Sequence, residues 1–270
     1  MPFIPLESLE DPRLRPYRQL KVTNESRGRD FFIVEGEKLL QRLMAAEHAV
    51  ESVVASTAYV EKLPLSELEH VPVFVLPHDL LERLVGFNFH RGVLARGRRK
   101  RGPALADFLA AHPKQLLLVI CPDVQDPENL GAIIRNSSAF GVNGVMLGPN
   151  CADPFSRRVL RVSMGTVLRM PILESSDLGA DLGRLHDAGV ELAATVLDPD
   201  AEPLDGALRT DRFALLFGSE GHGLERVWID RCPRKITIPM QAGTDSLNVA
   251  VATGVFLYHF TRRQRDGQTG

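Results

Sequence analysis

The chain has 270 residues, of which 44% are apolar and 24% charged, and its net charge is −2 at pH 7. This composition is typical of a globular protein of one or two domains. The cysteines are far apart and follow no C-x-x-C spacing, which argues against a zinc site or a disulfide framework. No apolar run approaches the ~20 residues of a membrane span, and the first residues do not resemble a signal peptide. We therefore expect a cytoplasmic protein without a metal site or membrane contact.

Positive charge is weakly concentrated in the N-terminal part. Residues 1–102 contain 16 Lys and Arg against 14 Asp and Glu, and residues 103–270 contain 16 against 20. The first 30 residues are rich in arginine and carry few apolar anchors. This segment is interpreted as a solvated arm or as an arm that follows a nucleic-acid backbone.

Strands and helices alternate after this arm, which indicates an α/β domain. The predicted strands are residues 31–34, 52–55, 71–76 and 92–95. Residues 96–103 follow, with five basic residues among the first six, and are interpreted as a solvated linker or a phosphate contact. We place a first domain at 1–100, the linker and a first helix at 101–113, and a second domain at 114–270.

The second domain is predicted to be α/β with a parallel sheet. Residues 115–120 form the continuous apolar run of a strand that is covered on both faces. Further strands are predicted at 144–147, 167–172, 191–196, 213–217 and 236–238. Helices are predicted at 127–140, 154–161, 182–188, 223–232 and 246–261.

The helix that begins at Pro127 carries the first candidate site residues. Proline suits a first helical turn, and Asn129 lies close enough to the start for its amide to reach loop backbone. Arg135 is six residues on, so it projects from another turn. It is interpreted either as part of a buried ion pair or as a functional cation.

A glycine-rich loop follows the predicted strand at 213–217 and contains Gly218, Ser219, Glu220, Gly221 and Gly223. Such a loop can bring backbone N–H groups against a ligand, or its glycines can serve tight packing. Its spacing matches neither the dinucleotide fingerprint nor a P-loop. Glu220 would repel a phosphate, which favours a neutral or cationic ligand.

The third polar segment follows the strand at 236–238, which Pro239 ends because it lacks an N–H for pairing. Asp245 or Ser246 is predicted to cap the helix that follows. Loops at the carboxyl ends of parallel strands bind ligands in open α/β sheets. We therefore expect the three segments to form one site.

These segments resemble the three motifs of the SpoU (TrmH-type) RNA methyltransferases of the SPOUT superfamily. The matching patterns are Asn129-x-Gly131-x-x-x-Arg135, Leu216-Phe217-Gly218-Ser219-Glu220-Gly221-x-Gly223-Leu224, and Ile238-Pro239-Met240 with Ser246-Leu247-Asn248-Val249. Glu35-Gly36 and His90-Arg91-Gly92-Val93 resemble the substrate-binding domain that often precedes this catalytic domain. That domain is similar in fold to small ribosomal RNA-binding proteins.

The resemblance implies a C-terminal α/β domain with a trefoil knot, a bound S-adenosylmethionine and a homodimer with the site near its interface. Gly218, Ile238 and Leu247 would line the cofactor pocket, and Ile238 and Met240 would offer main-chain contacts. No metal is implied.

The implied reaction is methyl transfer to a ribose 2′-hydroxyl of RNA, with ribosomal RNA favoured over transfer RNA. Arg135 would activate the hydroxyl, or would only hold phosphate and ribose, since arginine is a poor base. Asn129, Glu220, Ser246 and Asn248 would position the reacting groups. Arginines 157, 158 and 161 are interpreted as RNA contacts, with a solvated helix face as the alternative.

Two other functions remain open from the sequence. One is a non-catalytic RNA-binding protein that keeps the fold, which the retained polar motif residues disfavour. The other is an α/β enzyme with a nucleotide cofactor, which the absence of G-x-G-x-x-G and G-K-[ST] patterns disfavours.

Overall fold

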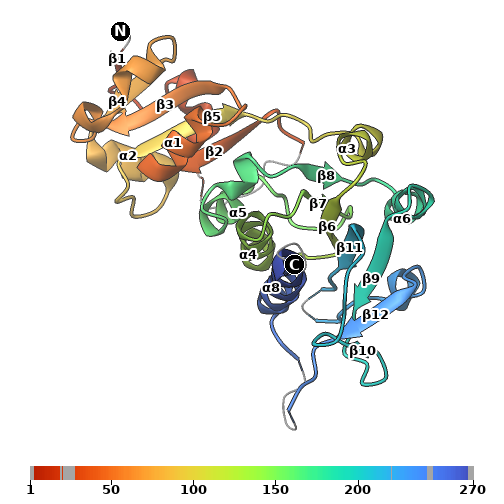
Figure 1. The fold of residues 1–270 in the computed structure, drawn as a ribbon. Helices are drawn as coiled ribbons and strands as arrows, with labels where there is room; N and C mark the ends of the chain where they lie inside the picture. The colour runs from red at the N-terminus through yellow and green to blue at the C-terminus, as the bar shows by residue number, and fades with distance from the viewer. Residues whose placement is uncertain (1–2, 19, 21–27, 220, 242–245, 267–270) are drawn as a thin grey trace. The chain divides into compact units, whose positions relative to one another are not determined.

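The computed structural model describes residues 3–18, 20, 28–219, 221–241 and 246–266, and it divides into two compact units (Figure 1). Unit 1 contains Met1–Arg101 and Phe155–Arg169, and unit 2 contains Gly102–Pro154 and Met170–Gly270. The segment Phe155–Arg169 thus belongs to unit 1, although it lies within the range predicted for the second domain. Its aromatic ring at Phe155 stacks on Phe32 of unit 1, with ring centroids 5.1 Å apart.

Unit 1 is built on a five-stranded mixed sheet with the order β1-β4-β3-β5-β2. The strands are β1 (Phe3–Pro5), β2 (Phe31–Glu35), β3 (Val50–Ser56), β4 (Val73–Leu76) and β5 (Val93–Arg98). The helices are α1 (Glu37–Met44), α2 (His78–Val85) and α5 (Arg157–Val162). Leucines of α1 and α2 are buried at helical spacing, so both helices pack on the sheet.

The N-terminal arm is part of this unit rather than a solvated extension. Residues Phe3–Pro5 pair in parallel with β4, and Pro12–Tyr17 forms a 3₁₀ turn. Leu14 and Tyr17 are fully buried, and the Tyr17 hydroxyl lies 2.7 Å from the Ser52 hydroxyl. The apolar anchors are sparse in the sequence, but Leu6, Leu14, Tyr17 and Leu20 are all buried. Residues 21–27 lie outside the described part of the chain.

Unit 2 is an α/β unit whose seven-stranded sheet has the order β10-β12-β9-β11-β6-β7-β8, with every described pair parallel. The strands are β6 (Leu116–Cys121), β7 (Gly144–Leu147), β8 (Ile172–Glu174), β9 (Glu191–Thr195), β10 (Glu202–Pro203), β11 (Arg212–Leu216) and β12 (Arg234–Thr237). All six residues of β6 are buried, as its continuous apolar run predicts. The trefoil knot stays a prediction.

Helices cover both faces of this sheet. Because side chains alternate along a strand, Phe213 and Leu216 of β11 point to opposite faces. Leu216 belongs to the core under α3 (Leu105–Ala111) and α6 (Leu178–Asp187). Phe213 packs against Phe260 of α8 (Val249–Asp266), with ring centroids 5.0 Å apart.

The helix α8 lies beside α4 (Pro127–Ala139), so the last helix of unit 2 packs on a helix from the first part of the unit (Figure 1). The Asn136 amide nitrogen donates to the Ala250 carbonyl at 2.8 Å, across 114 residues of sequence. A short helix, α7 (Arg226–Ile229), follows the glycine-rich loop. The C-terminal helix is therefore held by direct contacts against α4, the helix that carries Asn129 and Arg135.

The strand predicted at 167–172 is wrong. Residues Thr166–Leu168 form a 3₁₀ turn, and the strand β8 begins only at Ile172. The turn follows Gly165, whose φ of +75° reverses the chain, and Pro171 lacks the N–H that strand pairing needs. The apolar side chains at 167 and 168 are buried in the turn, which explains why they resemble a strand.

Candidate functional site

A cavity of unit 2, about 510 Å³ in volume, lies at the carboxyl ends of the strands β9, β11 and β12. Thr195–Leu197 follow β9, Phe217–Ser219 follow β11, and Ile238 and Met240 follow β12. The first turns of α4 and α8 complete the walls. Parallel strands open their loops toward the same edge of a sheet, which is why segments distant in sequence converge here.

Two asparagines join the helices that close the cavity. The Asn248 side-chain nitrogen donates to the Asn129 side-chain oxygen at 2.8 Å. The Asn248 side-chain oxygen accepts from the backbone N–H groups of Ala250 at 2.9 Å and Val251 at 3.3 Å. Asn248 therefore caps α8 and ties its start to the start of α4.

This cap corrects the prediction that Asp245 or Ser246 begins the helix. Ser246 lines the cavity, but the described first-turn N–H bonds go to Asn248. Asp245 lies outside the described residues. An asparagine satisfies both neighbours at once, since its oxygen accepts from the helix while its nitrogen donates across to Asn129.

The glycine-rich loop is closed on itself. Ser219 and Gly223 exchange two backbone hydrogen bonds, of 2.9 and 3.1 Å. A Cβ atom at Gly218 would stand 2.0 Å from the Gly223 carbonyl carbon and 2.1 Å from the Leu224 nitrogen. Gly218 thus serves tight packing of the loop, and the same packing holds its backbone against the cavity.

The lining of the cavity suits a ligand with an apolar ring and a positive charge. Phe217, Phe256, Val196 and Leu224 form apolar walls, and none of the described lining residues is Lys or Arg. Asp126 brings a carboxylate to the wall, and its Oδ1 accepts from the Glu128 N–H at 2.7 Å as the cap of α4. A carboxylate without a neighbouring cation attracts a cation and repels a phosphate.

The structure brings most of the predicted site residues together. The lining includes Asn129, Gly218, Ile238, Met240, Ser246, Leu247 and Asn248. Glu220 lies outside the described residues. Arg135 is exposed on α4 and does not line the cavity among the residues that the structure describes. Its part in the chemistry stays a prediction.

Several lining residues were not anticipated. Asp126 directly precedes the proline that opens α4, so a helix-cap pattern was available in the sequence. Thr195 ends β9, within the strand predicted at 191–196, and its hydroxyl donates to the Leu216 carbonyl at 2.8 Å. A polar residue at the carboxyl end of a buried parallel strand was the available signal for this position.

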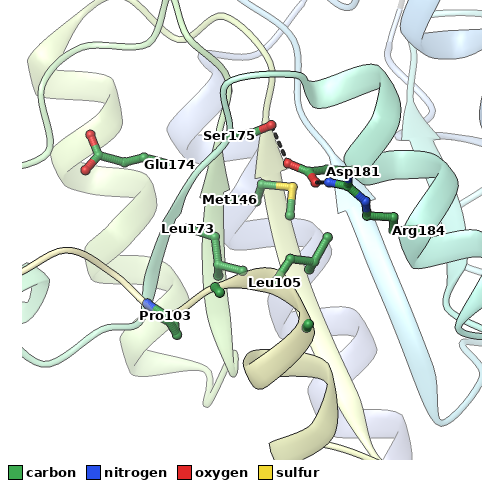
Figure 2. A pocket seen from close by; sticks show the side chains of 10 residues that line it. Pro103, Leu105, Met146, Leu173, Glu174, Ser175, Asp181 and Arg184 are labelled. Carbon is green, nitrogen blue, oxygen red and sulfur yellow. Dashed lines mark hydrogen bonds and ion pairs between the residues drawn. The ribbon is translucent and has the colours of Figure 1, made fainter.

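A second cavity of unit 2, about 310 Å³, lies beside the edge strand β8 and the start of α3. Figure 2 shows Asp181 turned toward both Ser175 and Arg184, whereas Glu174 points away from them. Asp181 accepts from the Ser175 hydroxyl at 2.6 Å and from the Arg184 guanidinium at 2.7 Å. Its polar groups satisfy one another, so this cavity is the weaker candidate for a ligand.

The described residues contain no cluster of three or more His, Cys, Asp or Glu that could hold a metal ion. No helix in the same part of the chain is long and apolar enough to cross a membrane. All three cysteines are buried, and burial raises the pKa of the Cys232 thiol to about 12.

Comparison with known proteins matches this arrangement to one family. Residues 116–258 match the family model described as the SpoU rRNA Methylase family. An uncharacterised tRNA/rRNA methyltransferase of Mycobacterium bovis is 34% identical, over 94% of this chain and 90% of its own. The 23S rRNA (guanosine-2′-O-)-methyltransferase RlmB of Nitrosomonas europaea is 32% identical, over 77% of this chain and 80% of its own.

Solved structures agree over nearly the whole length. An AdoMet-bound rRNA methyltransferase from Sinorhizobium meliloti superposes with a TM-score of 0.83 and 25% identity, over 97% of this chain and 98% of its own. The matched region contains all three polar segments that build the cavity. The chain belongs to the SpoU rRNA methylase family, as its motifs predict.

Proposed function

We propose that this protein transfers a methyl group from S-adenosylmethionine to the 2′-hydroxyl of a ribose in RNA. The observation that carries the proposal is the single cavity formed by the three motif segments and closed by the Asn129–Asn248 hydrogen bond. A relative named as a guanosine-2′-O-methyltransferase and a structural neighbour that binds AdoMet support the same reaction.

The residues of the cavity fit this cofactor. Its volume of about 510 Å³ is within the usual range for sites of small organic ligands. The apolar walls at Phe217, Phe256 and Val196 suit a purine ring, and the Asp126 carboxylate suits a cationic ligand. S-adenosylmethionine supplies the methyl group from a sulfonium, whose S–C bond breaks as the new O–C bond to the ribose forms.

The chain itself contributes position more than proton transfer. Asn248 and Asn129 fix the mouth of the cavity, since Asn248 caps α8 and donates to Asn129 in the first turn of α4. The 2′-hydroxyl has to lose its proton to a base during attack, and holding it in line with the methyl group can contribute ~7–11 kcal/mol in good cases. Ser246 lines the same wall and would orient the ribose.

Arg135 would act in a homodimer. It is exposed on α4, which packs on α8, and α8 carries an exposed stripe of Val251, Val255 and Tyr258, which are 53%, 40% and 50% exposed. These residues are spaced by four and three, so they share one helix face. We propose that this face meets a second copy and carries Arg135 of one subunit to the cavity of the other. There its guanidinium would hold the RNA phosphate and the ribose.

Ribosomal RNA is the proposed substrate, because the family description and the 23S rRNA relative both name it. We assign the RNA-binding role expected of the first domain to unit 1. A cytoplasmic location follows from that substrate.

Subunit mixing tests the reaction and the shared site together. Arg135→Ala and Asn248→Ala proteins are each expected to be nearly inactive with labelled S-adenosylmethionine and rRNA. Random reassembly should restore about one quarter of wild-type activity, because half of the dimers are hybrids with one complete site of two. Mass spectrometry of nucleosides would identify the 2′-O-methyl product.

If the mixture stays inactive while hybrids form, Arg135 does not act across the interface. If the wild-type protein binds rRNA and S-adenosylmethionine but gives no 2′-O-methyl nucleoside, the proposed reaction is wrong.

A further inference from the structure

A cavity of about 320 Å³ lies within unit 1 and belongs to no site described above. Glu35-Gly36 and Arg91 both line it, so the two short segments that carry the resemblance of the first domain meet at one place. Arg161 and Met164 close the same cavity from the segment that joins unit 1 late in the chain. Segments that are distant in the sequence therefore form one cavity.

The cavity has an excess of positive charge. The Glu35 carboxylate is held by Arg157 at 2.9 Å and by Arg91 at 3.6 Å, so two cations face one anion. Lys38 and Arg161 add two more cations to the wall. Only one further described acidic residue lines the cavity, and Arg157 itself is not among the lining residues, so the lining has three cations against two carboxylates, an excess of one positive charge.

That acidic residue, Glu37, accepts a hydrogen bond of 2.9 Å from the Tyr59 hydroxyl. The backbone of Gly92 also packs closely against the Tyr59 ring, because a Cβ atom at Gly92 would stand 2.7 Å from the ring. Gly92 has a φ of +69°, which glycine adopts without strain. The ring is therefore a flat apolar wall held in one orientation.

The start of α1 opens on the same space. Its N-cap is Gly36, with φ +92° and no side-chain cap, and the first-turn residues Glu37 and Lys38 line the cavity. First-turn N–H groups of a helix lack partners within the helix and attract anions. Here they add to the charge of Lys38 and Arg161.

Met164 supplies the independent observation. It is the one non-glycine residue with positive φ, +54°, in the described chain, and its N–H donates to the Arg161 carbonyl as α5 ends. Glycine is the common residue at such a helix end, because a side chain at positive φ strains the backbone. A methionine side chain at this strained position lines the cavity, as a ligand contact would require.

We propose that this cavity binds one nucleotide of the substrate RNA, a nucleotide other than the one that is methylated. Lys38, Arg161 and the start of α1 hold its phosphate, and its base packs against Tyr59 and Met164. The apolar walls distinguish a nucleotide from a bare phosphate, because unstacked bases of RNA pack on such side chains. The inference rests on the proposed function, since it needs an RNA substrate.

The test measures RNA affinity of the intact protein by fluorescence anisotropy over a range of salt concentrations. The variants are Lys38→Gln, Arg161→Gln and Met164→Gly, and the matched control is Arg83→Gln, an exposed arginine of α2 outside the cavity. Each loss of a phosphate contact should reduce the slope of log affinity against log salt by about 0.7–0.9. The control should leave the slope unchanged.

Met164→Gly separates binding from folding. Relief of the positive φ should raise thermal stability, whereas loss of the base contact should weaken RNA binding about fivefold with an unchanged salt slope. A purely structural role would not move the two quantities in opposite directions.

Equal RNA affinity and salt slope for all variants and the control would overturn the proposal, provided that the wild type binds and methylates the RNA. A wild-type protein that binds S-adenosylmethionine but no RNA would instead refute the proposed function. Photo-crosslinking of 4-thiouridine RNA to Tyr59 or Met164 would support the site directly.

Discussion

Asn248 offers the sharpest test of how the candidate active site is held together. Its side chain makes three described hydrogen bonds, one to Asn129 and two to the first turn of α8. Loss of an N-cap costs about 0.5–2 kcal/mol, and loss of one further net hydrogen bond costs about 0.5–1.5 kcal/mol. Asn248→Ala should therefore destabilise unit 2 by about 1–3.5 kcal/mol and weaken S-adenosylmethionine binding.

A conservative variant separates the two roles. Asn248→Ser keeps a good helix cap but is too short to reach Asn129, so it should lose only the second contribution. If the bond across the cavity positions the cofactor, Asn248→Ser should weaken cofactor binding nearly as much as Asn248→Ala while it retains more stability. Calorimetry with S-adenosylmethionine and chemical denaturation measure the two quantities.

The controls use the same pair of helices. Asn136→Ala removes a 2.8 Å bond between α4 and α8 that lies outside the cavity, so it should reduce stability but not cofactor affinity. A double-mutant cycle of Asn129→Ala with Asn248→Ala should show a coupling of about 0.5–3 kcal/mol. Additive losses, or full cofactor affinity in Asn248→Ser, would refute the role given to this hydrogen bond.

Three more outcomes are expected. Gly218→Ala should destabilise the loop by about 1–3 kcal/mol and impair S-adenosylmethionine binding. Gly221→Ala should change neither stability nor binding, because no atom lies within 4 Å of the added carbon. If calorimetry found the two variants alike, the close packing at Gly218 would be contradicted. Arg157→Met should cost about 1–3 kcal/mol in denaturant unfolding because it leaves the Glu35 carboxylate with only the longer contact to Arg91, and adding Glu35→Gln should recover most of the loss; no recovery would show that the charge is not the cause. Burial raises the pKa of the Cys232 thiol to about 12, so this thiol should stay protonated and unreactive toward an alkylating reagent at pH 8 until the protein unfolds; rapid labelling of native protein would argue against that burial.

The family, the α/β class and the position of the loops that line the 510 Å³ cavity could be predicted from the sequence. The run at 115–120 signals a buried parallel strand, and the observed strand at Leu116–Cys121 is buried throughout. The glycines and the proline after the predicted strands mark loops by their local backbone constraints. Such signals are local, so they survive without knowledge of the tertiary structure.

The cap of α8 shows where local signals end. Asp245, Ser246 and Asn248 are all good capping residues, and the sequence pattern does not choose among them. Asn248 is selected because its amide also reaches Asn129, which is 119 residues away. A residue that must satisfy two partners is identified only once both are in place.

The arginines of α5 show the same limit. Arg157 fits neither interpretation, an RNA contact or a solvated helix face, because it pairs with Glu35 across 122 residues and its side chain is 14% exposed. Arg161, four residues later, lines a cavity instead. Whether an arginine of this short helix pairs with a carboxylate or lines a cavity depends on what packs against its side of the helix.

By itself, the sequence determined most of the strands, the loops that follow them and the family, because hydrophobic period and backbone restrictions depend on neighbouring residues. The tertiary structure alone decided that Asn248 caps α8, that Phe155–Arg169 belongs to unit 1 and that Arg135 lies outside the cavity of its own chain. Each of these depends on contacts between residues more than 100 positions apart or on which face of a helix is covered, and packing settles both only when the chain is folded.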